Sequence, residues 1–151
     1  MRRLFATIAV ATLALGAAAD ELPYNESASA SADLQTALAA ARADRNDVLL
    51  VFGANWCPDC RELDRALKGS SHALISGRFQ VVKVDVGRFD KNLDLANQYG
   101  NPIKMGIPAV VVLTADNKIV YSSKGGELAN ARKMGDTGIY DFLSSHVTTA
   151  H

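Results

Sequence analysis

The chain has 151 residues, of which 48% are hydrophobic, and its 16 basic residues balance 16 acidic ones. This length allows one domain with a sizeable core and is short for two. A net charge of zero, with no cluster of Lys and Arg among aromatic residues, argues against nucleic-acid binding.

The first 19 residues have the order of a secretory signal peptide. Arg2 and Arg3 precede an apolar run over residues 4–15, and the small residues Ala17–Ala19 follow. A membrane anchor is the alternative, but this run is shorter than the roughly 20 residues that span a bilayer. The pattern therefore predicts export with cleavage.

The mature chain is expected to begin after Ala19, and a second small-residue cleavage site lies at 28–30. Residues 20–32 are rich in Ser, Ala, Glu and Asn and have no apolar period, which predicts a flexible lead-in. One domain is expected over 33–149. It would be periplasmic or secreted, with no part of the mature chain inserted in a membrane.

The domain is predicted to begin with a helix and a strand. Asp33 is suited to cap a helix over 33–43, where apolar residues recur at three- and four-residue spacing. The continuous apolar run 48–52 predicts a central strand that helices cover on both faces.

A second helix is expected from the cysteine-containing segment to about Lys68. Cys60, Leu63 and Leu67 fall on one face of this helix, whereas Asp64 falls elsewhere. The apolar face is predicted to pack on the sheet.

The rest of the chain predicts a mixed sheet. The expected elements are a strand over 79–86, a short helix from 93 to 100, strands over 109–113 and 119–121, and a C-terminal helix around 139–146. The strands in the first half of the domain are predicted to be parallel, and the last two strands are predicted to form an antiparallel hairpin. The predicted fold class is therefore α/β, with a mixed central sheet flanked by helices.

Two cysteines, Cys57 and Cys60, are the only ones in the chain and open the second helix. A cysteine at a helix N-terminus has backbone N–H groups near its sulfur, which favours the thiolate. Cys57 is thus the expected nucleophile, and Cys60, three residues later, is the expected resolving thiol.

Two other interpretations of this pair remain open. A structural disulfide would close a very short loop and would remove little chain entropy. A zinc site would have to recruit His146 and His151, which are far away in the sequence. We expect no metal, and we expect His72 to be an ordinary surface residue.

The segment Phe52-Gly53-Ala54-Asn55-Trp56-Cys57-Pro58-Asp59-Cys60, followed some fifty residues later by Gly106-Ile107-Pro108, resembles the thioredoxin superfamily. The resemblance covers about residues 33 to 147. It implies a thioredoxin fold and thiol-disulfide exchange, in which Cys57 attacks a substrate disulfide and Cys60 resolves the mixed disulfide. It also implies a substrate-binding site at Trp56, Ile107 and Pro108, with Pro108 preceded by a cis peptide bond.

The resemblance is incomplete at the proton acceptor of the resolving thiol. The acid that the family places six residues before the first cysteine would align with Val51, which cannot accept a proton. Lys83 matches the lysine beside that acid. Water, Asp59, Asp85 or Lys83 are the alternatives for the acceptor.

Two segments, 100–106 and 122–137, are longer than is usual in the family. The later one reads as a tolerated loop insertion. The earlier one adjoins the expected substrate groove, so Ile103 and Met105 are candidates for substrate contact.

The dipeptide Pro58-Asp59 between the cysteines is expected to tune the site. The Asp59 charge should raise the pKa of Cys57 and disfavour its thiolate, which favours a reductase over an oxidase. A reductase outside the cytoplasm would need a membrane thiol electron donor, because the sequence has no nicotinamide or flavin motif and no cofactor is expected. The expected substrates are protein disulfides and thiols.

Three alternatives stay open. These are a periplasmic oxidase or isomerase, a Cu(I) carrier that uses the same two thiolates, and a binding module in which the cysteines are incidental.

Overall fold

The computed structural model describes residues 21–147, so the predicted signal peptide lies outside the described residues. In chain order the elements are α1 (Ala30–Asp44), β1 (Asp47–Gly53), α2 (Pro58–Lys68), α3 (His72–Ile75), β2 (Phe79–Asp85), α4 (Leu93–Gln98), the 3-10 helix η1 (Pro102–Met105), β3 (Ala109–Leu113), β4 (Ile119–Ser122), α5 (Ala131–Phe142) and the π-helical turn η2 (Leu143–Val147). Within this part of the chain, no helix is long and apolar enough to cross a membrane.

The four strands form one mixed sheet in the order β2-β1-β3-β4. β1 and β2 are parallel, with Leu49 opposite Val81, and β1 and β3 are antiparallel, with Leu50 opposite Val111. β4 adds the antiparallel hairpin partner of β3. The predicted parallel first half and terminal hairpin are therefore confirmed.

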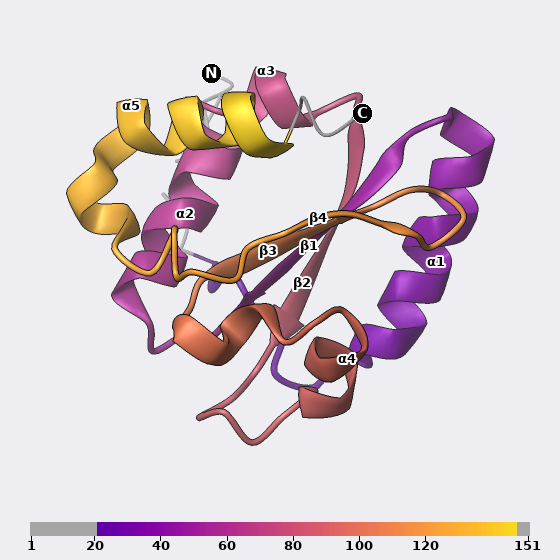
Figure 1. Ribbon diagram of the computed structural model, residues 1–151, viewed down its shortest axis with the longest axis horizontal. Coiled ribbons are helices and arrows are strands. Elements are labelled where there is room, and N and C mark those ends of the chain that lie inside the picture. Colours follow the sequence, from indigo (N-terminus) through magenta and orange to yellow (C-terminus); the bar gives the residue numbers. More distant parts are fainter. Residues whose placement is uncertain (1–20, 148–151) are drawn as a thin grey trace, which may run out of the picture.

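Helices cover both faces of the sheet (Figure 1). Alternate residues of β1 point to opposite faces, so Leu50 packs in a core with α1 and α4, while Leu49 packs in a second core with α2, α3 and α5. Every residue of β1 from Val48 to Gly53 is buried. The α/β sandwich with a mixed central sheet is thus confirmed.

Several element boundaries differ from the predicted ones. α1 begins at Ala30 rather than at residue 33, because the Ser29 side chain accepts a hydrogen bond from the Ala32 N–H and caps the helix. α5 begins at Ala131, so part of the segment 122–137 that reads as a loop insertion is helical. The helices α3 and η1 are too short to give a period in the sequence, and neither is predicted.

Helix α2 is anchored by a leucine at the interface between the sheet and α5. Leu63 is completely buried, whereas Leu22, in the segment before α1, is 57% exposed. Leu63→Ala should therefore lower the free energy of unfolding by about 2–5 kcal/mol through lost apolar burial and a residual cavity. Urea unfolding of the oxidised protein measures this loss. Leu22→Ala is the matched control, with an expected change within about 0.5 kcal/mol; similar losses in the two variants would contradict the assigned packing.

Candidate active site

A cysteine pair lies at the N-terminus of α2. Cys57 is the N-cap residue, Pro58 is the first helical residue, and the Cys57 Sγ accepts a hydrogen bond of 3.1 Å from the Cys60 N–H. The two cysteines form a disulfide with their Cα atoms 5.2 Å apart. Because the helix N-terminus directs N–H groups at the Cys57 sulfur, that sulfur is the one whose thiolate is stabilised when the disulfide is reduced.

The loop before β3 lies against this disulfide. The Ile107–Pro108 peptide bond is cis, and the Ile107 carbonyl oxygen lies 3.8 Å from the Cys57 Sγ. Both Ile107 and Pro108 are buried, so the loop offers its backbone rather than its side chains next to the sulfur.

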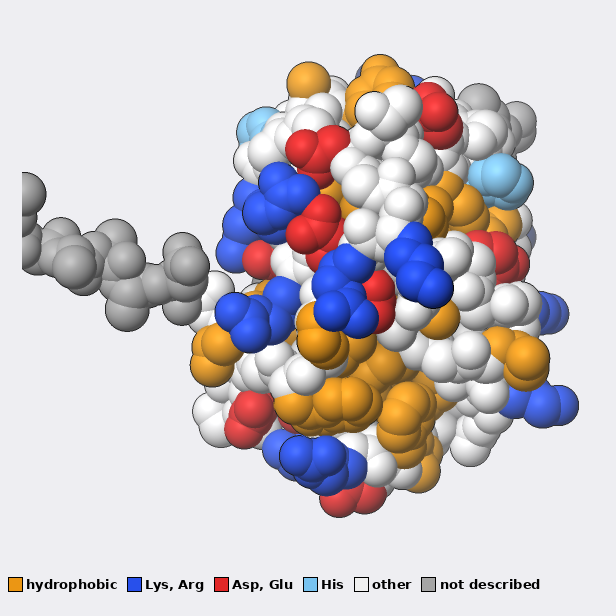
Figure 2. Space-filling model, turned by 90° about the vertical axis from the view of Figure 1, so that its left-hand side faces the viewer, with side chains coloured by type: hydrophobic (Ala, Val, Ile, Leu, Met, Phe, Trp, Pro, Cys, Tyr) orange, Lys and Arg blue, Asp and Glu red, His pale blue; other side chains and the backbone are white. Residues whose placement is uncertain are grey.

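Trp56 forms part of an exposed apolar surface beside the disulfide. Its side chain is 47% exposed, and its indole N–H donates a hydrogen bond of 2.7 Å to the Gly87 carbonyl oxygen. The Trp56 ring packs edge-on against Phe89, while the Arg88 guanidinium lies over it. Phe89 in turn lines a hollow with Leu93 and Lys104. Figure 2 shows hydrophobic side chains gathered on one face of the molecule, with Lys and Arg side chains around them.

The two candidates in the segment 100–106 lie in different environments. Met105 is 60% exposed, whereas Ile103 is 6% exposed and packs in the core with α1 and α4. Ile103 nevertheless lines the same hollow as Phe89, so it stays a candidate for substrate contact. Met105 stays a candidate.

The carboxylate of Asp59 is paired. Its Oδ1 accepts a hydrogen bond of 2.9 Å from the Arg132 backbone N–H and lies 3.4 Å from the Arg132 Nε. Arg132 is in the first turn of α5, so this contact joins the two helices on the same face of the sheet. The positive guanidinium offsets part of the charge that Asp59 places beside Cys57.

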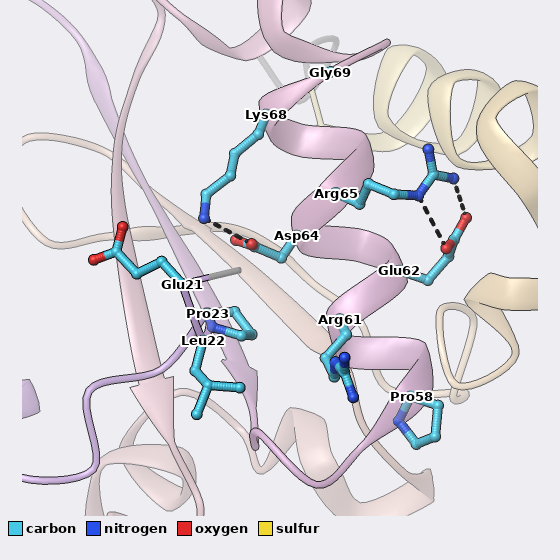
Figure 3. A pocket seen from close by; sticks show the side chains of 10 residues that line it. All are labelled: Glu21, Leu22, Pro23, Pro58, Arg61, Glu62, Asp64, Arg65, Lys68 and Gly69. Atoms are coloured by element: carbon cyan, nitrogen blue, oxygen red, sulfur yellow. Dashed lines mark hydrogen bonds and ion pairs between the residues drawn. The ribbon is translucent and has the colours of Figure 1, made fainter. Parts of the chain in front are cut away.

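Lys83 is half-buried and forms an ion pair with Asp64, with 2.7 Å between Nζ and Oδ1. Asp64 also pairs with Lys68 at 2.9 Å, and these two side chains point toward each other at the rim of a pocket between α2 and residues 21–23 (Figure 3). The prediction that Asp64 lies away from the buried face of α2 is wrong. It is 6% exposed and follows Cys60 by four residues, which places both on one side of the helix.

Burial and charge act in opposite directions on this ion pair. Burial alone would raise the pKa of Asp64, but hydrogen bonds and charges from Lys83 and Lys68 outweigh it and hold that pKa below its ordinary value. Burial lowers the pKa of Lys83 despite the opposing effect of Asp64. The buried carboxylate of Asp64 thus lies one helical turn after Cys60, paired with the half-buried Lys83.

Tyr24 brings the segment before α1 into the site. The Asn55 side chain holds its backbone with two hydrogen bonds, accepting from the Tyr24 N–H at 2.9 Å and donating to the Tyr24 carbonyl at 2.8 Å. The Tyr24 side chain is 2% exposed, so residues 21–29 make contacts that the prediction of a flexible lead-in does not include. A Cβ at Gly53 would overlap the Tyr24 hydroxyl and would lie 2.9 Å from the Cys60 Sγ. The hydroxyl of Tyr24 and the sulfur of Cys60 therefore lie side by side.

The zinc alternative finds no support in the described residues. Between residues 21 and 147, no group of three or more His, Cys, Asp or Glu side chains converges on a metal position. The His146 ring stacks on Phe142 with 4.9 Å between the centroids, and His151 lies outside the described residues.

Four residues that contact the site are not predicted from the sequence: Tyr24, Asn55, Asp64 and Arg132. A usable signal existed for Asp64, whose four-residue spacing from Cys60 predicts a shared helix face. Tyr24 and Arg132 come from segments that are distant in the sequence and follow no period. Their contacts depend on the tertiary packing.

Comparison with known proteins agrees with this geometry. The sequence model of a family described as thioredoxin-like matches residues 29–115, more than half of the chain. Among solved structures, the chain is similar to the disulphide isomerase from Xylella fastidiosa Temecula1, with 57% sequence identity and a TM-score of 0.80. That match covers 83% of this chain and 97% of the other.

A second structure supports the fold alone. The oxidised C-terminal domain of DsbD from Neisseria meningitidis shares 22% identity at a TM-score of 0.50, with 72% of this chain and 97% of that chain covered. The search of curated proteins finds no match. On the family match, the 57% identical structure and the helix-capping cysteine pair together, the chain belongs to the thioredoxin-like family.

Proposed function

We propose that this protein is a thiol-disulfide oxidoreductase that acts on protein disulfides outside the cytoplasm and works mainly as a reductase. The observation that carries the proposal is the position of Cys57, whose sulfur caps α2 and lies 3.8 Å from the Ile107 carbonyl oxygen. The helix N-terminus stabilises a thiolate there, and the neighbouring loop offers backbone groups to an extended substrate.

The reaction is a two-step exchange. The Cys57 thiolate attacks one sulfur of the substrate disulfide, forms a mixed disulfide and releases the other substrate sulfur as a thiolate. Cys60, as its thiolate, then attacks the Cys57 sulfur. The Cys57–Cys60 disulfide forms, and the second substrate thiol leaves reduced.

The apolar surface around Trp56 supports protein substrates. Phe89 extends this surface from the Trp56 ring. Met105, two residues before Ile107 in the sequence, is also exposed. Exposed apolar side chains beside a reactive sulfur suit a substrate whose own apolar residues are accessible, as in an incompletely folded protein.

Isomerisation is the second candidate function. It is favoured by the 57% sequence identity with the Xylella fastidiosa protein, a disulphide isomerase. Reduction and isomerisation share the first step and both need Cys57 reduced. They differ in whether Cys60 completes the reaction or the substrate rearranges first.

Location and the electron donor belong to the same proposal. The signal-peptide pattern of residues 1–19 supports action in the periplasm or outside the cell. A dithiol in an oxidising compartment must be reduced again after each turnover, and a membrane protein that passes electrons between thiols is the proposed donor.

Serine variants of the two cysteines test the exchange. Cys57→Ser should abolish the catalysed reduction of a protein disulfide, because no nucleophile remains. The assay uses dithiothreitol to reduce the oxidoreductase again after each turnover. Cys60→Ser should instead accumulate a mixed disulfide at Cys57, which mass spectrometry of acid-trapped protein detects. Isomerisation of a scrambled substrate that persists in Cys60→Ser would favour the second candidate, and full reductase activity in Cys57→Ser would contradict both.

The contact between Asp59 and Arg132 predicts a shift in reduction potential. Asp59→Asn removes a negative charge beside Cys57, so the thiolate gains stability. Where the reduced protein holds Cys57 as a thiolate, the potential should become less negative by about 30 mV for each tenfold gain in the stability of that thiolate. Arg132→Ala should shift the potential in the opposite direction, because the Asp59 charge loses its partner.

Equilibration in glutathione buffers with trapping of the thiols measures the potential. The double variant with both substitutions is the control. Arg132→Ala should have no effect when residue 59 is Asn, and an equal effect in both backgrounds would show that Arg132 acts independently of Asp59.

A further inference from the structure

The resolving cysteine has a buried phenol beside it. The Cys60 side chain is completely buried, and the Tyr24 hydroxyl lies beside it, over the Cα of Gly53. Gly53 leaves this space free, since a Cβ there would overlap the hydroxyl. Tyr24 itself is held in place by the Asn55 side chain, two residues before Cys57.

The Tyr24 hydroxyl makes no hydrogen bond to any described residue in the disulfide form. A buried hydroxyl without a partner is costly, and a disulfide sulfur is only a weak acceptor. A thiolate is a strong acceptor of hydrogen bonds. The hydroxyl is therefore placed to gain a good partner when Cys60 becomes a thiolate, which is the form in which Cys60 attacks.

The charged residues near Tyr24 and Cys60 are paired with one another and do not compete for the Tyr24 hydroxyl. Asp64 on α2 pairs with Lys83 and Lys68, and Asp85 at the end of β2 pairs with Lys91 at 3.3 Å. The Lys83 ammonium also lies 5.6 Å from the centroid of the Tyr24 ring and supports its orientation.

The Tyr24 hydroxyl keeps its proton at neutral pH. Burial, with a further effect of the negative charges of Asp64 and Asp85, raises its pKa well above the ordinary value. The phenol is thus a donor of a hydrogen bond and not a general base.

We propose that Tyr24 is a positioning residue that donates a hydrogen bond to the Cys60 sulfur and stabilises the thiolate that resolves the mixed disulfide. The proposal rests on the proposed function. In the resolving step the Cys60 thiol gives its proton to solvent water, its sulfur bonds to the Cys57 sulfur, and the bond from Cys57 to the substrate breaks. The departing thiolate takes the electron pair of that bond and then a proton from solvent, so no further reactant is needed.

Tyr24→Phe removes the hydroxyl and keeps the ring. Reduced protein is mixed with the aromatic disulfide dithiobis(nitrobenzoate), and the coloured thiol is followed by stopped flow. The first equivalent reports the attack of Cys57, and the second reports the attack of Cys60 on the mixed disulfide.

The second phase should be slowed about tenfold or more at neutral pH, as expected for the loss of a hydrogen bond to a charged group. The first phase should be unchanged. The difference between the variant and the wild type should shrink at high pH, where both proteins hold Cys60 as a thiolate.

Tyr99→Phe is the matched control. Tyr99 is also 2% exposed, but its hydroxyl donates a 2.7 Å hydrogen bond to Asn117. Both residues are far along the chain from the cysteines. Both phases should be unchanged in this variant. Tyr24→Phe should also fold, because the disulfide form loses no hydrogen bond to a described residue, and its free energy of unfolding should equal or exceed that of the wild type.

Three outcomes would overturn the proposal. An unchanged second phase in Tyr24→Phe, or equal slowing of both phases at every pH, would show that the hydroxyl has no specific effect on Cys60. A wild-type protein without a first phase would overturn the proposed function itself, and this proposal with it.

Discussion

The burial of β1 on both faces is the constraint on which the site depends. β1 is hydrogen-bonded to β2 on one side and to β3 on the other, so the place where it ends is fixed. Phe52 lies opposite Ala109, and Gly53 lies opposite Asp85. The residues that follow β1 therefore meet the loop before β3 and the turn after β2 at one end of the sheet. The cysteines, Ile107–Pro108 and the hydrogen bond from Trp56 to Gly87 all come together for this reason.

Much of this arrangement was predictable from the sequence because it follows from local patterns. The apolar run in β1 and the spacing of Cys60, Leu63 and Leu67 fix a buried strand that leads into an amphipathic helix. These two elements place the cysteine pair at a helix N-terminus. The loop at Ile107–Pro108 was predicted through the family resemblance and not from its own period.

The remaining contacts could not be predicted because they depend on where distant segments pack. Tyr24 is a single aromatic residue in a stretch rich in Ser and Ala, which gives no period and reads as unstructured. Arg132 reaches Asp59 only because α5 lies beside α2 on the same face of the sheet. The charge of Asp59 taken alone therefore overstates its effect on Cys57, since the sequence does not reveal the partner that offsets it.

The position of Tyr24 also has a consequence for maturation. The aromatic ring behind the resolving cysteine comes from the stretch just before α1, upstream of the second small-residue cleavage site at 28–30. Processing after Ala30 would remove the N-cap and first residue of α1, and with them the phenol of Tyr24 and the backbone partner of Asn55. Cleavage at one site or the other would thus yield two proteins with the same cysteines, of which only the longer keeps the phenol beside Cys60. A recombinant protein trimmed to the first residue of α1 would likewise lack Tyr24.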